Sequence, residues 1–122
     1  MPKSRVFYQR NHVFATVLHN QICEGHIMLA PIGPGKNYTD LTNAELFETV
    51  LAIKELSQLV KKAYSDAPDN EKVTGTSVVV QEFEAAKSGQ TSMNHLRVHI
   101  VPRRKSDNRS NEDIQNELDN FA

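Results

Sequence analysis

The chain has 122 residues, which suffices for one domain with a hydrophobic core but not for two. Hydrophobic residues make up 39% and charged residues 24%, as in ordinary globular proteins, and the net charge of −1 excludes a global attraction to nucleic acid or to an acidic membrane. Cys23 is the only cysteine, which excludes an intrachain disulfide, and without an apolar run of membrane-spanning length or a signal-peptide core we expect a cytoplasmic protein, with a nuclear share left open.

Three short strands are predicted in the first third of the chain. Val6–Tyr8 and Val13–Leu18 are rich in β-branched and aromatic residues, and a short polar turn separates them. Gly25–Pro31 is the third strand, and we expect Pro31 to end it because proline has no N–H for the strand ladder. The short connections between these strands favour antiparallel pairing.

One long helix is predicted at about residues 43–64. Thr42 and Glu45 form the capping-box pattern that marks a helix start. Apolar residues then recur at helical spacing and predict the buried face. These residues are Leu46, Val50, Ile53, Leu56 and Val60, with Phe47, Leu51 and Leu59 widening the stripe.

Two more strands and a short helix follow. The strands are Thr76–Phe83 and His95–Val101, and we expect Pro102 to stop the second. Asn111–Leu118 is predicted to form a short C-terminal helix. The order β-β-β-α-β-β predicts an α+β fold with a mostly antiparallel five-stranded sheet.

The last strand carries an unusual row of nitrogen-rich side chains. His95, Arg97 and His99 alternate with aliphatic residues and therefore project to one face of the strand. A guanidinium offers five donors in a fork that fits phosphate, so the row favours an anion site. We expect no metal site, because the two histidines lie about 13 Å apart along a strand and Arg97 would repel a cation.

Other candidate residues are weaker on their own. His26 alone is typical of a buried, hydrogen-bonded histidine, and Cys23 of a structural thiol. The basic cluster Arg103-Arg104-Lys105 is typical of a solvated exit from the strand, with a polyphosphate guide as the alternative.

Taken together, these residues resemble the histidine triad (HIT) family, whose strand carries His-φ-His-φ-His-φ-φ, where φ is apolar. Residues 95–101 match this frame except that Arg97 replaces the middle histidine. Gly89-Gln90-Thr91 is similar to the family's Gly-Gln-Ser/Thr turn, and Gly25-His26 to its Gly-His strand. Gln81 matches a glutamine of the fragile-histidine-triad branch that contacts the scissile phosphate.

The resemblance implies a single domain over residues 1–122, with a core at about 6–104 and a tail at 105–122. It also implies a homodimer with a continuous ten-stranded sheet. The implied ligand is a nucleotide or dinucleoside polyphosphate, held by Gln81, Gln90, Thr91 and His26. No cofactor is expected, and whether Mg²⁺ accompanies the polyphosphate stays open.

The resemblance also implies a mechanism that this sequence alters. In the family the middle histidine attacks the α-phosphorus and forms a nucleotidyl-histidine that water resolves, while the flanking histidines orient the groups. Arg97 stands at that position, and a guanidinium stays protonated without an available lone pair. His95, Arg97 and His99 are therefore expected to bind and stabilise a phosphate with little or no turnover.

Two smaller departures concern ligand recognition. Leu18 stands where the family usually has Asp or Asn for the ribose hydroxyls, and Asn20 is the nearest substitute. The segment between the Gly-Gln turn and His95 is one residue longer than usual. A register with Asn94 at the first triad position conflicts with strand parity, because it turns aliphatic residues toward the site.

Three hypotheses stay open from the sequence. The first is a nucleotide-binding HIT protein with lost or strongly reduced catalysis. The second is an active dinucleoside polyphosphate hydrolase in which Arg97 is a variant of an ordinary histidine. The third is a non-enzymatic dimeric scaffold in which Leu18 fills the ribose site. The sequence does not predict the base preference, the polyphosphate length or the physiological role.

Overall fold

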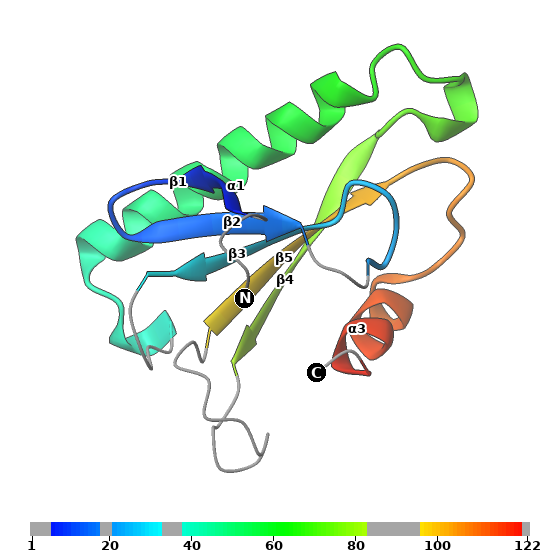
Figure 1. Ribbon diagram of the computed structural model, residues 1–122. Coiled ribbons are helices and arrows are strands. Elements are labelled where there is room, and N and C mark those ends of the chain that lie inside the picture. The colour runs from blue at the N-terminus through cyan, green and yellow to red at the C-terminus, as the bar shows by residue number, and fades with distance from the viewer. Residues whose placement is uncertain (1–5, 18–20, 33–37, 83–95, 121–122) are drawn as a thin grey trace.

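The computed structural model describes residues 6–17, 21–32, 38–82 and 96–120 (Figure 1). Five strands and two α-helices account for most of this part of the chain. In chain order they are β1 (Val6–Gln9), β2 (Val13–Val17), β3 (Ile27–Pro31), α1 (Asn43–Ala63), β4 (Gly75–Glu82), β5 (Leu96–Arg103) and α3 (Asn111–Asp119). Short 3-10 helices occupy Tyr38–Asp40 and Asp69–Glu71.

The strands form one sheet in the order β1-β2-β3-β5-β4, and each neighbouring pair is antiparallel. The predicted α+β fold, with a five-stranded antiparallel sheet, one long helix and a short C-terminal helix, is therefore confirmed. Strand β5 lies between β3 and β4, and it pairs with β4 over its whole length and with β3 from Val98 to Ile100.

Pro102 does not stop β5, contrary to the sequence prediction, because the strand continues to Arg103. Pairing with β3 ends at Ile100, while pairing with β4 continues to Arg103. The Pro102 carbonyl accepts from the Cys23 thiol at 3.5 Å, so the backbone polar groups of this residue face away from β4. The missing proline N–H thus removes no bond from the β4 ladder.

Helix α1 begins as the sequence predicts. The Thr42 side chain accepts from the Glu45 N–H at 3.1 Å, and the Glu45 carboxylate accepts from the Thr42 N–H at 2.9 Å. This reciprocal pair satisfies two donors that a helix start otherwise leaves without partners.

The buried face of α1 differs from the predicted stripe. Thr49, Ala52, Leu56 and Val60 are buried, whereas Leu46 is 47% and Val50 57% exposed. The sequence prediction is confirmed for Leu56 and Val60 and wrong for Leu46 and Val50, because the helix carries apolar residues on two faces. Ala52 and Thr49 are small enough to approach the sheet closely, and Leu56 and Val60 pack on the same face, while Leu46 and Val50 remain outside the core.

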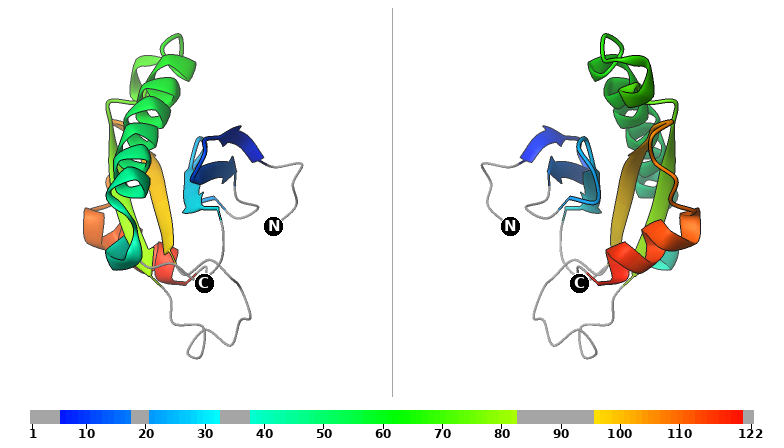
Figure 2. Two further views of the ribbon diagram at one scale, coloured as in Figure 1. Left: turned by 90° about the vertical axis from the view of Figure 1, so that its left-hand side faces the viewer. Right: turned by 90° about the vertical axis from the view of Figure 1, so that its right-hand side faces the viewer.

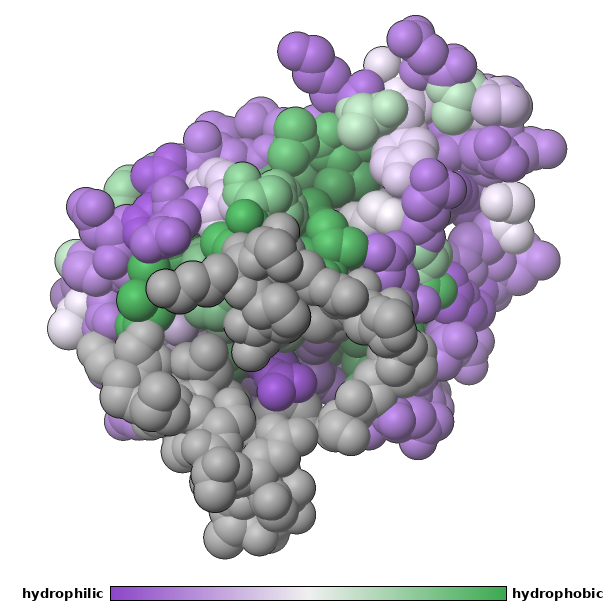
Figure 3. Space-filling model, in the orientation of Figure 1, coloured by the Kyte–Doolittle hydropathy of each residue, from purple (hydrophilic) through white to green (hydrophobic). Residues whose placement is uncertain are grey.

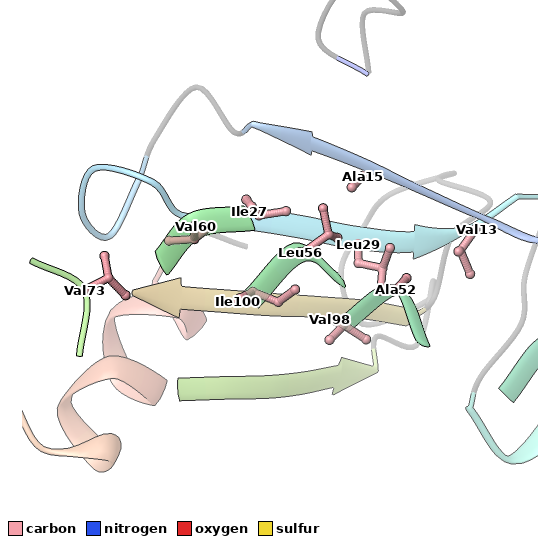
Figure 4. Close-up of a cluster of buried hydrophobic side chains, with 10 residues drawn as sticks. All are labelled: Val13, Ala15, Ile27, Leu29, Ala52, Leu56, Val60, Val73, Val98 and Ile100. Atoms are coloured by element: carbon pink, nitrogen blue, oxygen red, sulfur yellow. The ribbon is translucent and has the colours of Figure 1, made fainter. Parts of the chain in front are cut away.

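The main core lies between α1 and the sheet. Its buried residues come from α1, β2, β3 and β5, together with Val73, and Figure 4 shows their side chains converging. They are Val13, Ala15, Ile27, Leu29, Ala52, Leu56, Val60, Val73, Val98 and Ile100. Figure 2 shows α1 running alongside β4 and β5.

A second, smaller core lies on the other face of β5. Val101 packs there with Ile114 and Leu118 of α3, since successive residues of a strand point to opposite faces. On the side of the molecule shown in Figure 3, hydrophobic residues gather near the centre and hydrophilic residues surround them. Within the described ranges, neither α-helix combines the length and the apolar character needed to cross a bilayer.

Candidate functional site

The candidate site lies on the face of β5 that is turned away from α1. Val98 and Ile100 belong to the core under α1, so Arg97 and His99 project to the opposite face by strand parity. This is the side on which α3 packs through Val101. The site is therefore held between a central strand and the C-terminal helix.

Several predicted site residues cannot be placed. His95, Gln90 and Thr91 lie outside the described residues, as do Leu18 and Asn20. Arg97, His99, Gln81 and His26 are described, and the structure brings the last three into one hydrogen-bonded cluster.

A tight turn places His26 directly before β3. Gly25 has a φ of 93°, in the region that favours glycine, and a Cβ there would come within 3.1 Å of both Pro102 and Tyr64. The His26 N–H donates to the Cys23 carbonyl at 3.2 Å and closes the turn. The Gly-His dipeptide thus has a structural reason: glycine allows the turn that buries the histidine.

His26 and His99 meet through their rings. Nε2 of His26 lies 2.9 Å from Nδ1 of His99, and the ring centroids are 5.1 Å apart. His26 is fully buried and His99 is only 4% exposed. The Ile22 backbone N–H donates to Nδ1 of His26 at 3.1 Å, so both ring nitrogens of His26 are paired within the protein. His26 therefore acts on any ligand through His99.

The cluster continues from His99 to the C-terminal helix. Nε2 of His99 lies 2.9 Å from Oε1 of Gln81, and Nε2 of Gln81 donates to Oδ1 of Asp119 at 2.9 Å. Gln81 is itself buried at 7% exposure. The result is a continuous chain of hydrogen bonds from a backbone amide, through two imidazoles and one amide, to a carboxylate.

This chain fixes the direction of every hydrogen bond. The Ile22 N–H can only donate, so Nδ1 of His26 accepts and its Nε2 carries the proton. That proton is donated to Nδ1 of His99, whose Nε2–H is then donated to the Gln81 oxygen. Both rings are neutral Nε2–H tautomers in this arrangement.

Burial keeps the two rings neutral. Desolvation lowers the pKa of His26 to about 4. Desolvation, with smaller contributions from the neighbouring His26 and the Arg97 charge, lowers the pKa of His99 to about 3. Near neutral pH the site therefore has one positive charge from this set, on Arg97.

Arg97 lies opposite Gln81 on the neighbouring strand β4. Residues directly opposite in an antiparallel pair have Cβ atoms about 5 Å apart and project to the same face. The Arg97 side chain is half-buried, and desolvation lowers its pKa, but a guanidinium remains charged under physiological conditions. The arrangement offers a fixed cation beside a directional donor on His99, which suits an oxyanion.

Sequence reasoning missed both ends of the hydrogen-bond chain. The Ile22 contribution is a backbone N–H and leaves no side-chain signal. Asp119 carries a weak signal, because it follows Leu118 in a helix whose apolar residues Ile114 and Leu118 are four apart and predict the docked face.

A metal ion finds no ready ligand set here. Among the described residues, no group of three or more His, Cys, Asp or Glu side chains is arranged to hold one. Nδ1 of each ring accepts a hydrogen bond and Nε2 of each ring carries a proton, so neither ring presents a lone pair outward.

Comparison with protein families gives a match over most of the chain. The sequence profile of the HIT domain family matches residues 2–106. A nitrilase and fragile histidine triad fusion protein, NitFhit, of Caenorhabditis elegans is 31% identical over 115 residues, which cover 94% of this chain and 24% of that protein. A bis(5'-adenosyl)-triphosphatase of Dictyostelium discoideum is 27% identical over 117 residues, 96% of this chain and 72% of that protein.

Solved structures with a similar fold include proteins of the same kinds. The crystal structure of the C. elegans NitFhit protein aligns with a TM-score of 0.70 and 30% identity, covering 99% of this chain and 27% of that one. The diadenosine triphosphate hydrolase of Plasmodium falciparum, solved in complex with cyclomarin A, aligns with a TM-score of 0.70 and 25% identity, covering 99% and 76%. The chain spans about a quarter of the NitFhit protein and 58% of a bis(5'-nucleosyl)-tetraphosphatase from Schizosaccharomyces pombe that is 29% identical over 95% of this chain.

Proposed function

The chain belongs to the HIT domain family, and from this membership we propose that it binds a nucleotide or dinucleoside polyphosphate through the phosphate groups but hydrolyses it slowly or not at all. Its relatives include proteins named as bis(5'-adenosyl)-triphosphatases, which supports the ligand class. The observation that carries the proposal is Arg97, a permanent cation on the same strand face as His99 and beside Gln81.

Arg97 anchors the phosphate in this proposal. A guanidinium donates two parallel N–H bonds to two oxygens of one phosphate, and such charge-assisted bonds are about twice as strong as neutral ones. His99 contributes the donor on Nε2, which a phosphate oxygen takes over from the Gln81 oxygen. His95, Gln90 and Thr91 complete the phosphate cradle according to the family resemblance.

The same residue explains the expected loss of turnover. Covalent catalysis requires a nucleophile with a lone pair, and the Arg97 guanidinium has none available. His99 cannot replace it in this geometry, because its Nδ1 accepts from His26 and its Nε2 carries the proton donated to Gln81. The site therefore retains binding and charge stabilisation without an attacking group.

The test is a paired measurement on the wild-type protein and Arg97→His. Calorimetry with adenosine monophosphate measures binding, and release of the monophosphate from diadenosine triphosphate measures turnover. We expect wild-type binding with negligible turnover, and a gain of hydrolysis in Arg97→His because the substitution restores the full histidine row. Arg104→His is the matched control, since Arg104 donates to the backbone carbonyls of Glu24 and Glu71.

The outcomes separate the proposal from the scaffold hypothesis, whereas sequencing of the source gene tests whether Arg97 is a variant of an ordinary histidine. Absence of nucleotide binding to the wild type would contradict the proposal and favour the scaffold. Efficient turnover by the chain with Arg97 would contradict it, because a different nucleophile would then be required. Binding without a gain in Arg97→His would show that loss of the nucleophile is not the cause of inactivity.

A homodimer completes the proposal. Strand β4 is one edge of the five described strands, and Val78 and Val80 on it are 41% and 50% exposed. A hollow of about 430 Å³ lies beside it, lined by Val80 together with Leu46 and Val50 of α1. Pairing of two β4 strands about a two-fold axis would cover this surface and join the sheets into one of ten strands.

A further inference from the structure

The position of Asp119 sets it apart from the other carboxylates of α3. Its Oδ1 accepts from Nε2 of Gln81 at 2.9 Å and from Nε2 of Gln115, four residues earlier, at 3.2 Å. An ionised carboxylate only accepts hydrogen bonds, so Asp119 requires the amino group of Gln81 to face it. Asp119 is therefore connected to the site by its hydrogen bond from Gln81 and not by a bond to either imidazole.

The two ends of the hydrogen-bond chain demand the same orientation of Gln81. From one end, the Ile22 N–H forces a proton onto Nε2 of His99 and hence requires the Gln81 oxygen to face His99. From the other end, Asp119 requires the Gln81 amino group to face away from His99. Rotation of the amide by half a turn would set donor against donor at His99 and acceptor against acceptor at Asp119.

The two ends are also joined by a second route. Arg109 donates to the Ile22 carbonyl at 3.3 Å and to Glu117 of α3 at 2.7 Å. Its guanidinium also pairs with Asp107, and two N–H groups each donate at 3.0 Å. The turn that starts the hydrogen-bond chain and the helix that ends it are thus held together as one unit, which fixes the distance that the chain has to span.

We propose that Asp119 is a positioning residue, which holds the Gln81 amide against His99 in the resting site and thereby sets how readily the site accepts a phosphate. The inference rests on the proposed phosphate-binding function of this site. A phosphate needs N–H donors, and in the resting arrangement the Nε2–H of His99 is donated to the Gln81 oxygen, while Asp119 accepts from one N–H of Gln81. An anion that accepts from His99 Nε2 therefore displaces the Gln81 oxygen, and the bond to Asp119 opposes this movement of the amide.

The test compares Asp119→Asn with Asp119→Ala. Both variants remove the negative charge, but only asparagine keeps an oxygen that accepts from Gln81. Nitrogen-15 NMR of the imidazoles reports the Nε2–H tautomer of His99 and the exchange of that proton with water. Gln115→Ala is the matched control, because Gln115 contacts the same carboxylate oxygen but no other member of the chain of hydrogen bonds.

We expect Asp119→Asn and Gln115→Ala to keep the slowly exchanging His99 Nε2–H signal and Asp119→Ala to broaden it. We also expect Asp119→Ala to bind adenosine monophosphate about threefold to tenfold more tightly than Asp119→Asn, the change that loss of one hydrogen bond produces. Equal behaviour of the two Asp119 variants in both measurements would overturn the proposal. If no form of the protein binds the nucleotide, the proposed function is wrong, while the imidazole signals still decide the role of Asp119.

Discussion

Two histidines that face each other are stable only while at least one ring is neutral, and His26 and His99 are both neutral. Nε2 of His26 donates the one hydrogen bond between the rings. A second proton, on Nδ1 of His99, would place two donors against each other. Protonation of His26 at Nδ1 would set two donors, that nitrogen and the Ile22 N–H, against each other. Protonation of either ring is therefore unfavourable in the folded protein.

The stability of the fold is expected to fall as the pH is lowered from about 7 to about 5. The unfolded histidines bind protons near their ordinary pKa of 6.5, whereas the folded pKa values are about 4 for His26 and about 3 for His99. The unfolded state then binds more protons, so stability is present above pH 6.5 and is lost as the pH falls through it, by up to about 1.4 kcal/mol per pH unit for each ring. Urea unfolding at the two pH values measures the change.

A carboxylate serves as the control for this pH dependence. Hydrogen bonds from Arg109 lower the pKa of Asp107 to about 2, so its contribution is lost only as the pH falls below the ordinary value of 3.8. Asp107→Asn should therefore keep the loss between about pH 7 and about pH 5, whereas His99→Asn should reduce it by roughly half. A wild-type stability that stays flat across this interval would contradict neutral burial of the two rings.

At the residue level, the sequence predicts the face of a side chain better than its partner. The alternation of polar and aliphatic residues predicts that Arg97 and His99 share a face, and the structure places them so. It does not reveal that His99 is enclosed by His26 and Gln81, because these residues lie 73 and 18 positions away in the sequence. Such contacts depend on strand order, which local patterns do not encode.

At the scale of an element, the sequence predicts where a helix begins better than which of its faces is buried. The capping boxes of α1 and α3 involve residues three apart, so the Thr42–Glu45 pair is readable from the sequence. The buried face of α1 is not, since the helix is apolar on two sides and the sheet accepts the side with Ala52. Strand β5 likewise passes Pro102 because its neighbour on one edge ends earlier, a fact of tertiary structure.

Two leucines on α1 test which face is buried. Leu56 is 1% exposed in the main core, and Leu59, three residues later, is 48% exposed. Leu56→Ala should lower the free energy of unfolding by about 3 kcal/mol, because it leaves a cavity among close-packed side chains. Leu59→Ala should cost less than about 1 kcal/mol. Equal losses in urea unfolding would contradict the difference in burial between the two leucines.

At the scale of the whole molecule, the exposed apolar residues of α1 and β4 call for a partner surface. Phe47 is 70% exposed, and Leu46, Val50, Val78 and Val80 are 41% to 57% exposed. Val80 and Leu46 line the same hollow, so helix and strand contribute to one continuous surface. Edge strands of this kind are open to pairing with another chain unless charge or proline blocks them. A second copy supplies both a matching strand and a matching apolar surface through one symmetric contact.

We therefore expect the wild-type protein to be a dimer whose association depends on β4. A stable interface buries about 800 Å² on each partner, and a lysine at its centre would have to be desolvated without an opposite charge. Val80→Lys should thus shift the mass measured by light scattering from twice the 13.8 kDa of one chain to a single chain. Val17→Lys is the matched control, because Val17 is a strand valine of 38% exposure on β2, outside the hollow beside β4. A monomeric wild type, or a dimer that survives Val80→Lys and dissociates with Val17→Lys, would place the interface elsewhere.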